Sequence, residues 1–89
     1  SRSAAAHAGL GEVSFQMGRF AESVRHHRKA IALDRNNGKY HTKLANAYYK
    51  LREYARAIAH WKRALELDPS NSLARSYIRI AQQKLNSEK

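Results

Sequence analysis

The chain has 89 residues, of which 17 are Lys or Arg and 7 are Asp or Glu, so its formal net charge is +10 at pH 7. It has no cysteine for disulfides, and its scarce glycine and proline, with abundant Ala, Leu, Lys and Arg, favour helices over strands. No apolar run approaches the roughly 20 residues that span a bilayer, and Ser1–His7 lacks the apolar core of a signal peptide. We therefore expect one all-α domain with no membrane span and a cytoplasmic location.

The spacing of apolar residues predicts five helices, near residues 4–17, 21–34, 39–51, 55–68 and 72–86. Gly18 indicates a left-handed turn after the first helix, and Arg52-Glu53 forms the turn after the third. Asn36-Asn37-Gly38 separates the second helix from the third. Asp68-Pro69-Ser70-Asn71 ends the fourth helix, because proline disfavours helix in the residue before it, and Asn71 is a suitable N-cap for the fifth.

The chain repeats itself with a period of 34 residues. This offset pairs identical residues along the whole of the first four helices: His7 with His41, Leu10 with Leu44, Ala21 with Ala55, His26 with His60, Ala30 with Ala64, Leu33 with Leu67, Asp34 with Asp68 and Asn37 with Asn71. Similar apolar residues fill positions between them, such as Phe15 with Tyr49 and Val24 with Ile58. Two unrelated helix pairs would not keep one register, so the chain consists of two equivalent helical hairpins and one further helix.

This repeat resembles the tetratricopeptide repeat (TPR) family. The second unit has the family's signature residues at Leu44-Ala45, Tyr48, Tyr54, Ala57, Ala64 and Pro69, and the first keeps Leu10-Gly11, Gly18, Phe20 and Ala30. The first unit departs from the pattern at Ser14, Ser23 and Arg35. The resemblance implies a fragment of a right-handed α-solenoid, with repeats at 4–37 and 38–71, a capping helix at 72–86 and a frayed tail at 87–89.

Small residues have a mechanical role in such a fold. Gly11, Ala45 and Ala57, with Ala30 and Ala64, fall where helix axes must approach within about 8–10 Å. The fifth helix has an apolar stripe at Leu73, Tyr77, Ile78, Ala81 and Leu85. Its Arg79 and Gln82 replace residues that face a partner helix in the preceding repeat, as expected of a terminal cap. The N-terminal end has no comparable cap: either the alanine-rich segment from Ala4 to Phe15 tolerates exposure, or further repeats precede it in a longer array, which is the alternative we favour.

The resemblance also implies a concave surface lined by the first helix of each hairpin. On the first helix, the candidate residues on this surface are Ala8, Glu12, Phe15 and Gln16, and Ile80 continues it on the cap. The residues predicted to bind a ligand are Lys39, Lys43, Asn46, Tyr49, Lys50, Tyr77 and Lys84. Because lysines surround an aromatic anchor, we expect the partner to be an acidic peptide segment of another protein, with the chain serving as a scaffold.

One variant of the family clamps the carboxylate tail of chaperones with lysines and asparagines. Here Asn46 matches an asparagine of that clamp, but Thr42 stands in place of its partner lysine. Ala8 and Glu12 occupy the corresponding places in the first unit, and Leu73 and Tyr77 those in the cap. The resemblance therefore does not extend to a chaperone-tail receptor.

Two other binding modes remain open. The second helices carry Arg25-His26-His27-Arg28-Lys29 and Lys62-Arg63, so the outer face is also basic and attracts nucleic acid or an anionic surface without specificity. Nucleic acid is the less favoured partner, because no row of aromatic residues is available for base stacking. The second mode is self-association through Leu10, Val13 and Met17 of the first helix.

The sequence predicts no metal site, no cofactor and no catalytic site. His26 and His27 are adjacent on a helix and point about 100° apart, so they cannot chelate together. His27 replaces the aromatic Trp61 of the second unit and is interpreted as a packed core residue. No pair of carboxylates, cysteine nucleophile or glycine-rich phosphate loop is present, and Ser14 and Ser23 lack an organised base.

Overall fold

The computed structural model describes residues 1–88, and within them it contains five helices and no strand. These are α1 (Arg2–Gln16), α2 (Phe20–Leu33), α3 (Gly38–Lys50), α4 (Tyr54–Leu67) and α5 (Ser72–Ser87). The all-α prediction is confirmed. Each predicted helix is present, with its first residue within two positions of the expected one and its last within one.

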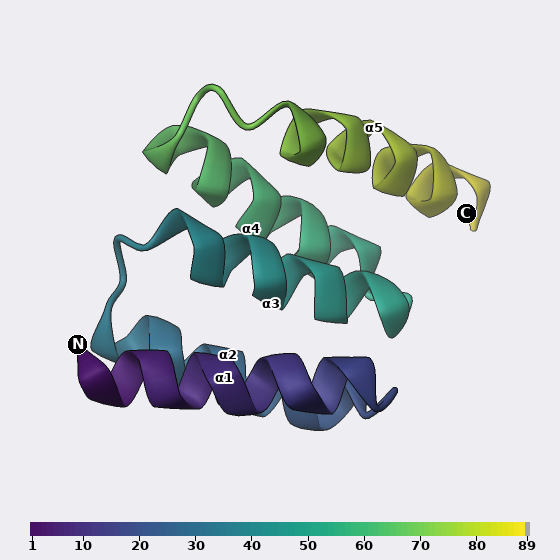
Figure 1. The fold of residues 1–89 in the computed structure, drawn as a ribbon. Coiled ribbons are helices and arrows are strands. Elements are labelled where there is room, and N and C mark those ends of the chain that lie inside the picture. Colours follow the sequence, from purple (N-terminus) through teal and green to yellow (C-terminus); the bar gives the residue numbers. More distant parts are fainter. Residues whose placement is uncertain (89) are drawn as a thin grey trace.

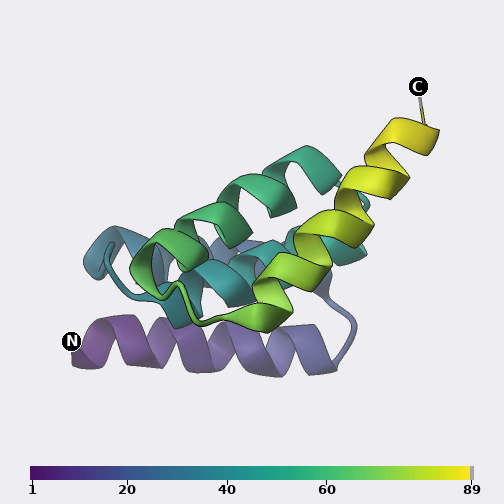
Figure 2. The ribbon, with the colours of Figure 1, turned by 90° about the horizontal axis from the view of Figure 1, so that it is seen from above.

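The helices stack in chain order. Each of α1 to α4 packs against the next helix, and α1 also touches α3. In Figure 1 the hairpin of α3 and α4 lies above that of α1 and α2, with α5 beyond it. Figure 2 shows that α5 runs obliquely to α1, so that the two chain ends point away from each other. No helix among the described residues combines the length and apolarity required to cross a bilayer.

Asparagine side chains start the helices that open each new unit. The Oδ1 of Asn37 accepts hydrogen bonds from the backbone N–H groups of Lys39 (3.0 Å) and Tyr40 (3.3 Å) at the start of α3. The Oδ1 of Asn71 accepts from the N–H of Ala74 (3.0 Å) at the start of α5. Each side chain satisfies donors that have no partner within the helix, so the predicted capping role of Asn71 is confirmed and Asn37 repeats it 34 residues earlier.

The two hairpin turns have the same backbone conformation but different residues. Gly18 has φ of 78°, and Arg52, its equivalent one repeat later, has φ of 64°. After Gly18, the N–H of Arg19 donates to the carbonyl of Ser14 (2.8 Å); after Arg52, the N–H of Glu53 donates to that of Tyr48 (2.9 Å). These bonds close the ends of α1 and α3 in the Schellman pattern, which requires a left-handed residue.

The core is built on small side chains between helices. The alanines predicted at close approaches, Ala30, Ala45, Ala57 and Ala64, are buried, as is Gly11. Large side chains fill the spaces beside them in the second unit, where Leu44 and Trp61 are each 1% exposed. The prediction that these small residues permit close packing is confirmed.

The first hairpin reaches the same packing with different chemistry. A Cβ atom on Gly11 would lie 2.7 Å from the Nε2 of His27, so the imidazole occupies the space that a side chain would fill. His27 is 1% exposed, which confirms its prediction as a core residue. The hydroxyl of Ser23 donates to the Gly11 carbonyl (2.8 Å), and that of Ser14 donates to Glu22 (3.0 Å), so both serines join α1 to α2.

The fifth helix corrects two predictions. Its packed face consists of Ala74, Ile78, Ala81 and Leu85, whereas Leu73 is 65% exposed and does not belong to it. Leu73 lies one position before Ala74, about 100° around the helix, and therefore falls beside the packed face rather than on it. The predicted tail begins too early, because α5 includes Ser87, whose hydroxyl donates to the Gln83 carbonyl (2.9 Å). Lys89 of that predicted tail lies outside the described residues.

The turn at Arg52 predicts a stabilising substitution. A non-glycine residue in the left-handed region strains the folded backbone by about 1–2 kcal/mol. Glycine removes this strain but also increases the conformational entropy of the unfolded chain, which cancels part of the gain in stability. We expect Arg52→Gly to raise the free energy of unfolding by about 0.5–1 kcal/mol and the melting temperature by a few degrees, measured by thermal and urea denaturation. Gly18→Arg is the reciprocal control and should destabilise by a similar amount, since no atom lies within 4 Å of its Cβ position. A loss of stability in Arg52→Gly would contradict this account.

The buried His27 predicts a dependence of stability on pH. Burial lowers the pKa of His27 to about 4, because the charged imidazolium loses its hydration. A histidine in the unfolded chain has a pKa near 6.5. The contribution of neutral His27 to the free energy of unfolding is therefore complete above that pH and is lost as the pH falls toward 4. We expect the free energy of unfolding to fall by about 1–2 kcal/mol between pH 7 and pH 5. Burial, His41 and Arg28 also lower the pKa of His60, which adds a loss of the same sign.

The control for this pH dependence is His27→Gln, which removes the titrating group. Its unfolding free energy should be lower at pH 7 but should change less between pH 7 and pH 5 than that of the parent chain. Urea denaturation at each pH gives both values. Equal slopes in the two proteins would show that His27 does not carry the pH dependence.

Candidate functional site

The larger of two cavities on one side of α3 lies between that helix, the end of α4 and the loop that leads into α5. It has a volume of about 690 Å³, and Ala64 and Leu67 of α4 contribute to its apolar lining. Lys39, Lys43 and Asn46 project from α3 into its wall. Gly38, the first residue of α3, also lines it. The remaining lining is polar and comes from Thr42 and from the two loops that precede α3 and α5: Asp34, Asn36, Asn37, Asp68 and Asn71.

A smaller cavity of about 350 Å³ adjoins the C-terminal half of α3. It is lined by aromatic and aliphatic side chains from four helices, together with two polar ones: Phe15, Asn46, Tyr49, Lys50, Trp61, Tyr77 and Ile80. The rings form a connected group, since the centroid of Trp61 lies 5.5 Å from Tyr77, which stacks on it, and 5.8 Å from Tyr49. This cavity can therefore hold an apolar side chain against aromatic faces.

Asn46 lines both cavities and connects them into one surface, which we call the α3–α5 groove. The indole N–H of Trp61 donates to the Oδ1 of Asn46 at 3.2 Å. Because indole is only a donor, this bond fixes the orientation of the amide and leaves the Asn46 NH₂ group free to donate. The groove thus has a basic polar half, an aromatic half and an amide donor between them.

Two aspartates at the loop end of the groove counteract its lysines. Asp34 accepts a hydrogen bond from the Asn37 amide at 3.4 Å. Asp68 accepts from the hydroxyl of Ser70 (2.6 Å) and from its backbone N–H (3.2 Å). These bonds from Ser70 lower the pKa of Asp68, so its carboxylate is charged at neutral pH. The larger cavity therefore contains carboxylates as well as lysines, whereas Lys50 lines the smaller cavity, whose lining within residues 1–88 includes no carboxylate.

The structure brings together six of the seven residues predicted to bind a ligand. Lys39, Lys43 and Asn46 line the larger cavity, and Tyr49, Lys50 and Tyr77 join Asn46 around the smaller one. Lys84 is exposed on α5 and lines neither cavity. Of the α1 residues placed on the same surface, Phe15 lines the smaller cavity, whereas Ala8 is buried and Gln16 is exposed outside both.

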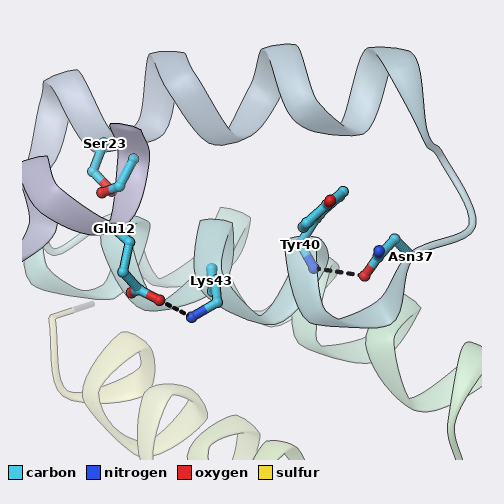
Figure 3. A network of polar contacts seen from close by, with 6 residues as sticks. Glu12, Ser23, Asn37, Tyr40 and Lys43 are labelled. Carbon is cyan, nitrogen blue, oxygen red and sulfur yellow. Dashed lines mark hydrogen bonds and ion pairs between the residues drawn. The ribbon is translucent and has the colours of Figure 1, made fainter. Parts of the chain in front are cut away.

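Glu12 affects the charge of the groove in a way that the sequence did not indicate. Its carboxylate forms an ion pair with the ammonium of Lys43, between α1 and α3 (Figure 3). The two side chains are 41% and 36% exposed, so the pair is accessible to water and contributes little to stability. It nevertheless neutralises one of the three groove lysines in the absence of a ligand.

Sequence reasoning missed several groove residues. It assigned Trp61 only to the core, although its ring also lines the smaller cavity, and it did not place Leu67 or Asn71 on this surface. The identity of Asn37 and Asn71 at the 34-residue offset indicated that both start a helix. It could not indicate that the two caps border one cavity.

The histidines form a contact that sequence pairing did not suggest. The 34-residue offset relates His41 and His60 each to a histidine in the first repeat. In the structure, however, His41 and His60 meet within one hairpin, with their Nδ1 atoms 3.2 Å apart. Among the described residues, no group of three or more His, Cys, Asp or Glu side chains is placed to hold a metal ion.

Comparisons with known proteins agree with this geometry. Sequence models described as "Tetratricopeptide repeat" and "TPR repeat" match residues 38–71 and 11–52. No curated protein sequence matches the chain. Among solved structures, the first TPR of Spaghetti (RPAP3) bound to the HSP90 peptide SRMEEVD is similar with a TM-score of 0.90 and 25% identity. That match covers 93% of this chain and 66%, just under two thirds, of the other.

Two further structures have the same arrangement. The second TPR of Spaghetti (RPAP3), also bound to SRMEEVD, has a TM-score of 0.90 and 26% identity, over 96% of this chain and 79% of that one. The TPR domain of Arabidopsis OM64 has a TM-score of 0.92 at 20% identity, over 97% and 71%, and shows the fold alone. With two models of the family that together match residues 11–71, and with five stacked helices, the chain belongs to the tetratricopeptide repeat family.

Proposed function

We propose that the chain is a protein-binding module, not an enzyme, and that its α3–α5 groove holds an acidic peptide segment of a partner protein. The observation that carries this proposal is the continuity of the groove through Asn46, which places an aromatic pocket beside lysine side chains. A peptide bound there would insert an apolar side chain near Trp61 and Tyr77 and direct carboxylates to Lys43 and Lys50.

The solved relatives support a peptide as the class of ligand. Two TPR domains at 25% and 26% identity are bound to SRMEEVD, a peptide with two glutamates and an aspartate. Asp34 and Asp68 give this groove a negative end, which should exclude acidic residues there and so orient the peptide. We therefore expect a ligand whose acidic residues lie at one end of the bound segment.

Charge reversal tests the groove. After a panel of acidic heptapeptides that includes SRMEEVD is screened, the tightest binder is titrated by calorimetry against Lys43→Glu/Lys50→Glu. We expect its affinity to fall about tenfold or more, because attraction becomes repulsion at two contacts. The matched control is Lys29→Glu/Lys62→Glu, which changes the net charge equally at exposed positions outside the groove. Equal losses in both variants would favour general attraction of anions, which random duplex DNA at two ionic strengths would then show.

A second variant should act in the opposite direction. Glu12→Gln removes the partner of Lys43 without changing the apolar lining. We expect this variant to bind the same peptide more tightly, because Lys43 can pair with a carboxylate of the peptide without first breaking its ion pair with Glu12. Unchanged affinity in both Glu12→Gln and the lysine variant would exclude the α3–α5 groove as the binding site.

Self-association through α1 is a second proposed property. Leu10, Val13 and Met17 are 51%, 56% and 59% exposed and lie on one side of α1. We expect light scattering to show an average mass that rises with concentration, and Val13→Lys/Met17→Lys to abolish this rise. Leu33→Lys, at a 53% exposed position on α2, is the control and should behave as the parent chain. A constant monomer mass in the parent chain would contradict this proposal.

A further inference from the structure

Two adjoining cavities lie between α2 and α4, on the side of α3 that faces away from the α3–α5 groove. They have volumes of about 390 and 520 Å³ and share Ala59 and His60. Along α3, His41, Leu44 and Tyr48 line them, whereas Thr42, Asn46 and Tyr49 line the α3–α5 groove; at 100° per residue these sets occupy opposite faces of the helix. The two surfaces are therefore separate.

Four arginines line these cavities, which we call the arginine groove. Arg28 of α2 and Arg35 of the following loop lie on one side, and Arg56 and Arg63 of α4 on the other. Neither cavity has a carboxylate among its described lining residues, in contrast to the α3–α5 groove.

The carboxylates nearest in sequence leave much of this charge unpaired. Arg56 pairs with Glu53 (3.1 Å), and Arg63 lies 4.0 Å from Glu66, in both cases at exposed positions. Within residues 1–88, Arg28 and Arg35 form no ion pair. Unpaired guanidinium groups around a hollow without carboxylates favour an anionic occupant.

Within the arginine groove, the 390 Å³ cavity contains the hydrogen-bond donors that are held most firmly in place. Arg63 donates from Nη2 to the Oδ1 of Asn36 at 3.0 Å, which holds its guanidinium beside the loop that carries Arg35. A guanidinium has five N–H donors, so this bond leaves others available to an oxyanion. Two such groups facing one hollow match the geometry of a phosphate, which accepts paired hydrogen bonds from arginine.

Hydrogen bonds to neighbouring groups determine where His60 can donate. The Nε2 of His41 lies 2.9 Å from the carbonyl oxygen of Arg35, and because a carbonyl only accepts, this nitrogen carries the proton. The Nδ1 of a neutral His41 is then an acceptor, so the Nδ1 of His60, 3.2 Å away, is the donor. The Nε2 of His60 remains as the atom at which a further proton would make the ring a cation with a free N–H.

We propose that the 390 Å³ cavity is a binding site for a phosphate group, held by Arg35, Arg63 and the protonated His60. The bound dianion would offset the cost of placing a third cation beside two arginines, so that protonation of His60 and binding strengthen each other. The charged and titratable groups around His60 come from the loop and from all three packed helices: Arg28, Arg35, His41, Tyr48, Arg56 and Arg63.

Sulfate is the first probe, because its charge stays constant from pH 8 to pH 6. We expect saturable binding in ¹H–¹⁵N titrations, with shifts concentrated around Arg35, His60 and Arg63. Arg35→Gln/Arg63→Gln should weaken binding about tenfold or more. Arg25→Gln/Lys62→Gln removes the same charge at exposed positions outside both cavities and should change affinity less than twofold. Equal losses in the two variants, or shifts spread over the whole surface, would overturn the site.

The role of His60 is tested by pH. Affinity for sulfate should increase from pH 8 to pH 6 in the parent chain and remain constant in His60→Gln, with circular dichroism used to verify folding. An affinity in the parent chain that does not change with pH would overturn the assignment of His60.

Inorganic phosphate and a neutral peptide carrying one phosphoserine then distinguish a free ion from a protein-borne group. Binding of either one at Arg35 and Arg63 supports the site. Failure of both overturns it, and neither result depends on the acidic peptide in the α3–α5 groove.

Discussion

The contact between Gly11 and His27 shows the constraint on which the fold depends, namely that the two helices of a hairpin must lie close enough for their backbones to exclude large side chains. Where α1 meets α2 the space is taken by an imidazole, and a Cβ at position 11 would overlap it at 2.7 Å. In the second hairpin Ala45 stands at the equivalent place, with Trp61 in the place of His27. Such close packing fixes the two helices of each hairpin relative to each other, and α3 therefore presents a defined set of side chains to the cavities on either side of it.

The two repeats have the same backbone conformation at equivalent positions even where their side chains differ. Gly18 and Arg52 adopt the same left-handed conformation at equivalent turns, although only glycine does so without strain. His27 and Trp61 occupy equivalent core positions, and only the histidine brings a titratable group into the interior. The first repeat therefore gains a sensitivity to acid that the second lacks at this position.

The helices and core could be predicted from the sequence because they depend on local spacing and on the 34-residue period. Asn71 and Gly18 were identified because a cap or a left-handed turn involves atoms only a few residues apart. The contacts of Lys43 with Glu12 and of His41 with His60 join residues 31 and 19 positions apart. No periodic signal encodes them, since they depend on the rotation of one helix against another. Leu73 was misplaced for the same reason, since two apolar stripes adjoin on α5 and only packing selects one.

The separation of two grooves by α3 changes the interpretation of the net charge of +10. On one face of α3, Lys39, Lys43 and Lys50 are partly balanced by Glu12, Asp34 and Asp68, so this groove carries side chains of both signs. On the opposite face four arginines line cavities without carboxylates. Solubility alone requires charge on the surface but no such partition, because solvated lysines and arginines serve equally well at any exposed position. The placement of arginine in one groove and lysine in the other matches paired hydrogen bonding in the first case and long-range attraction in the second.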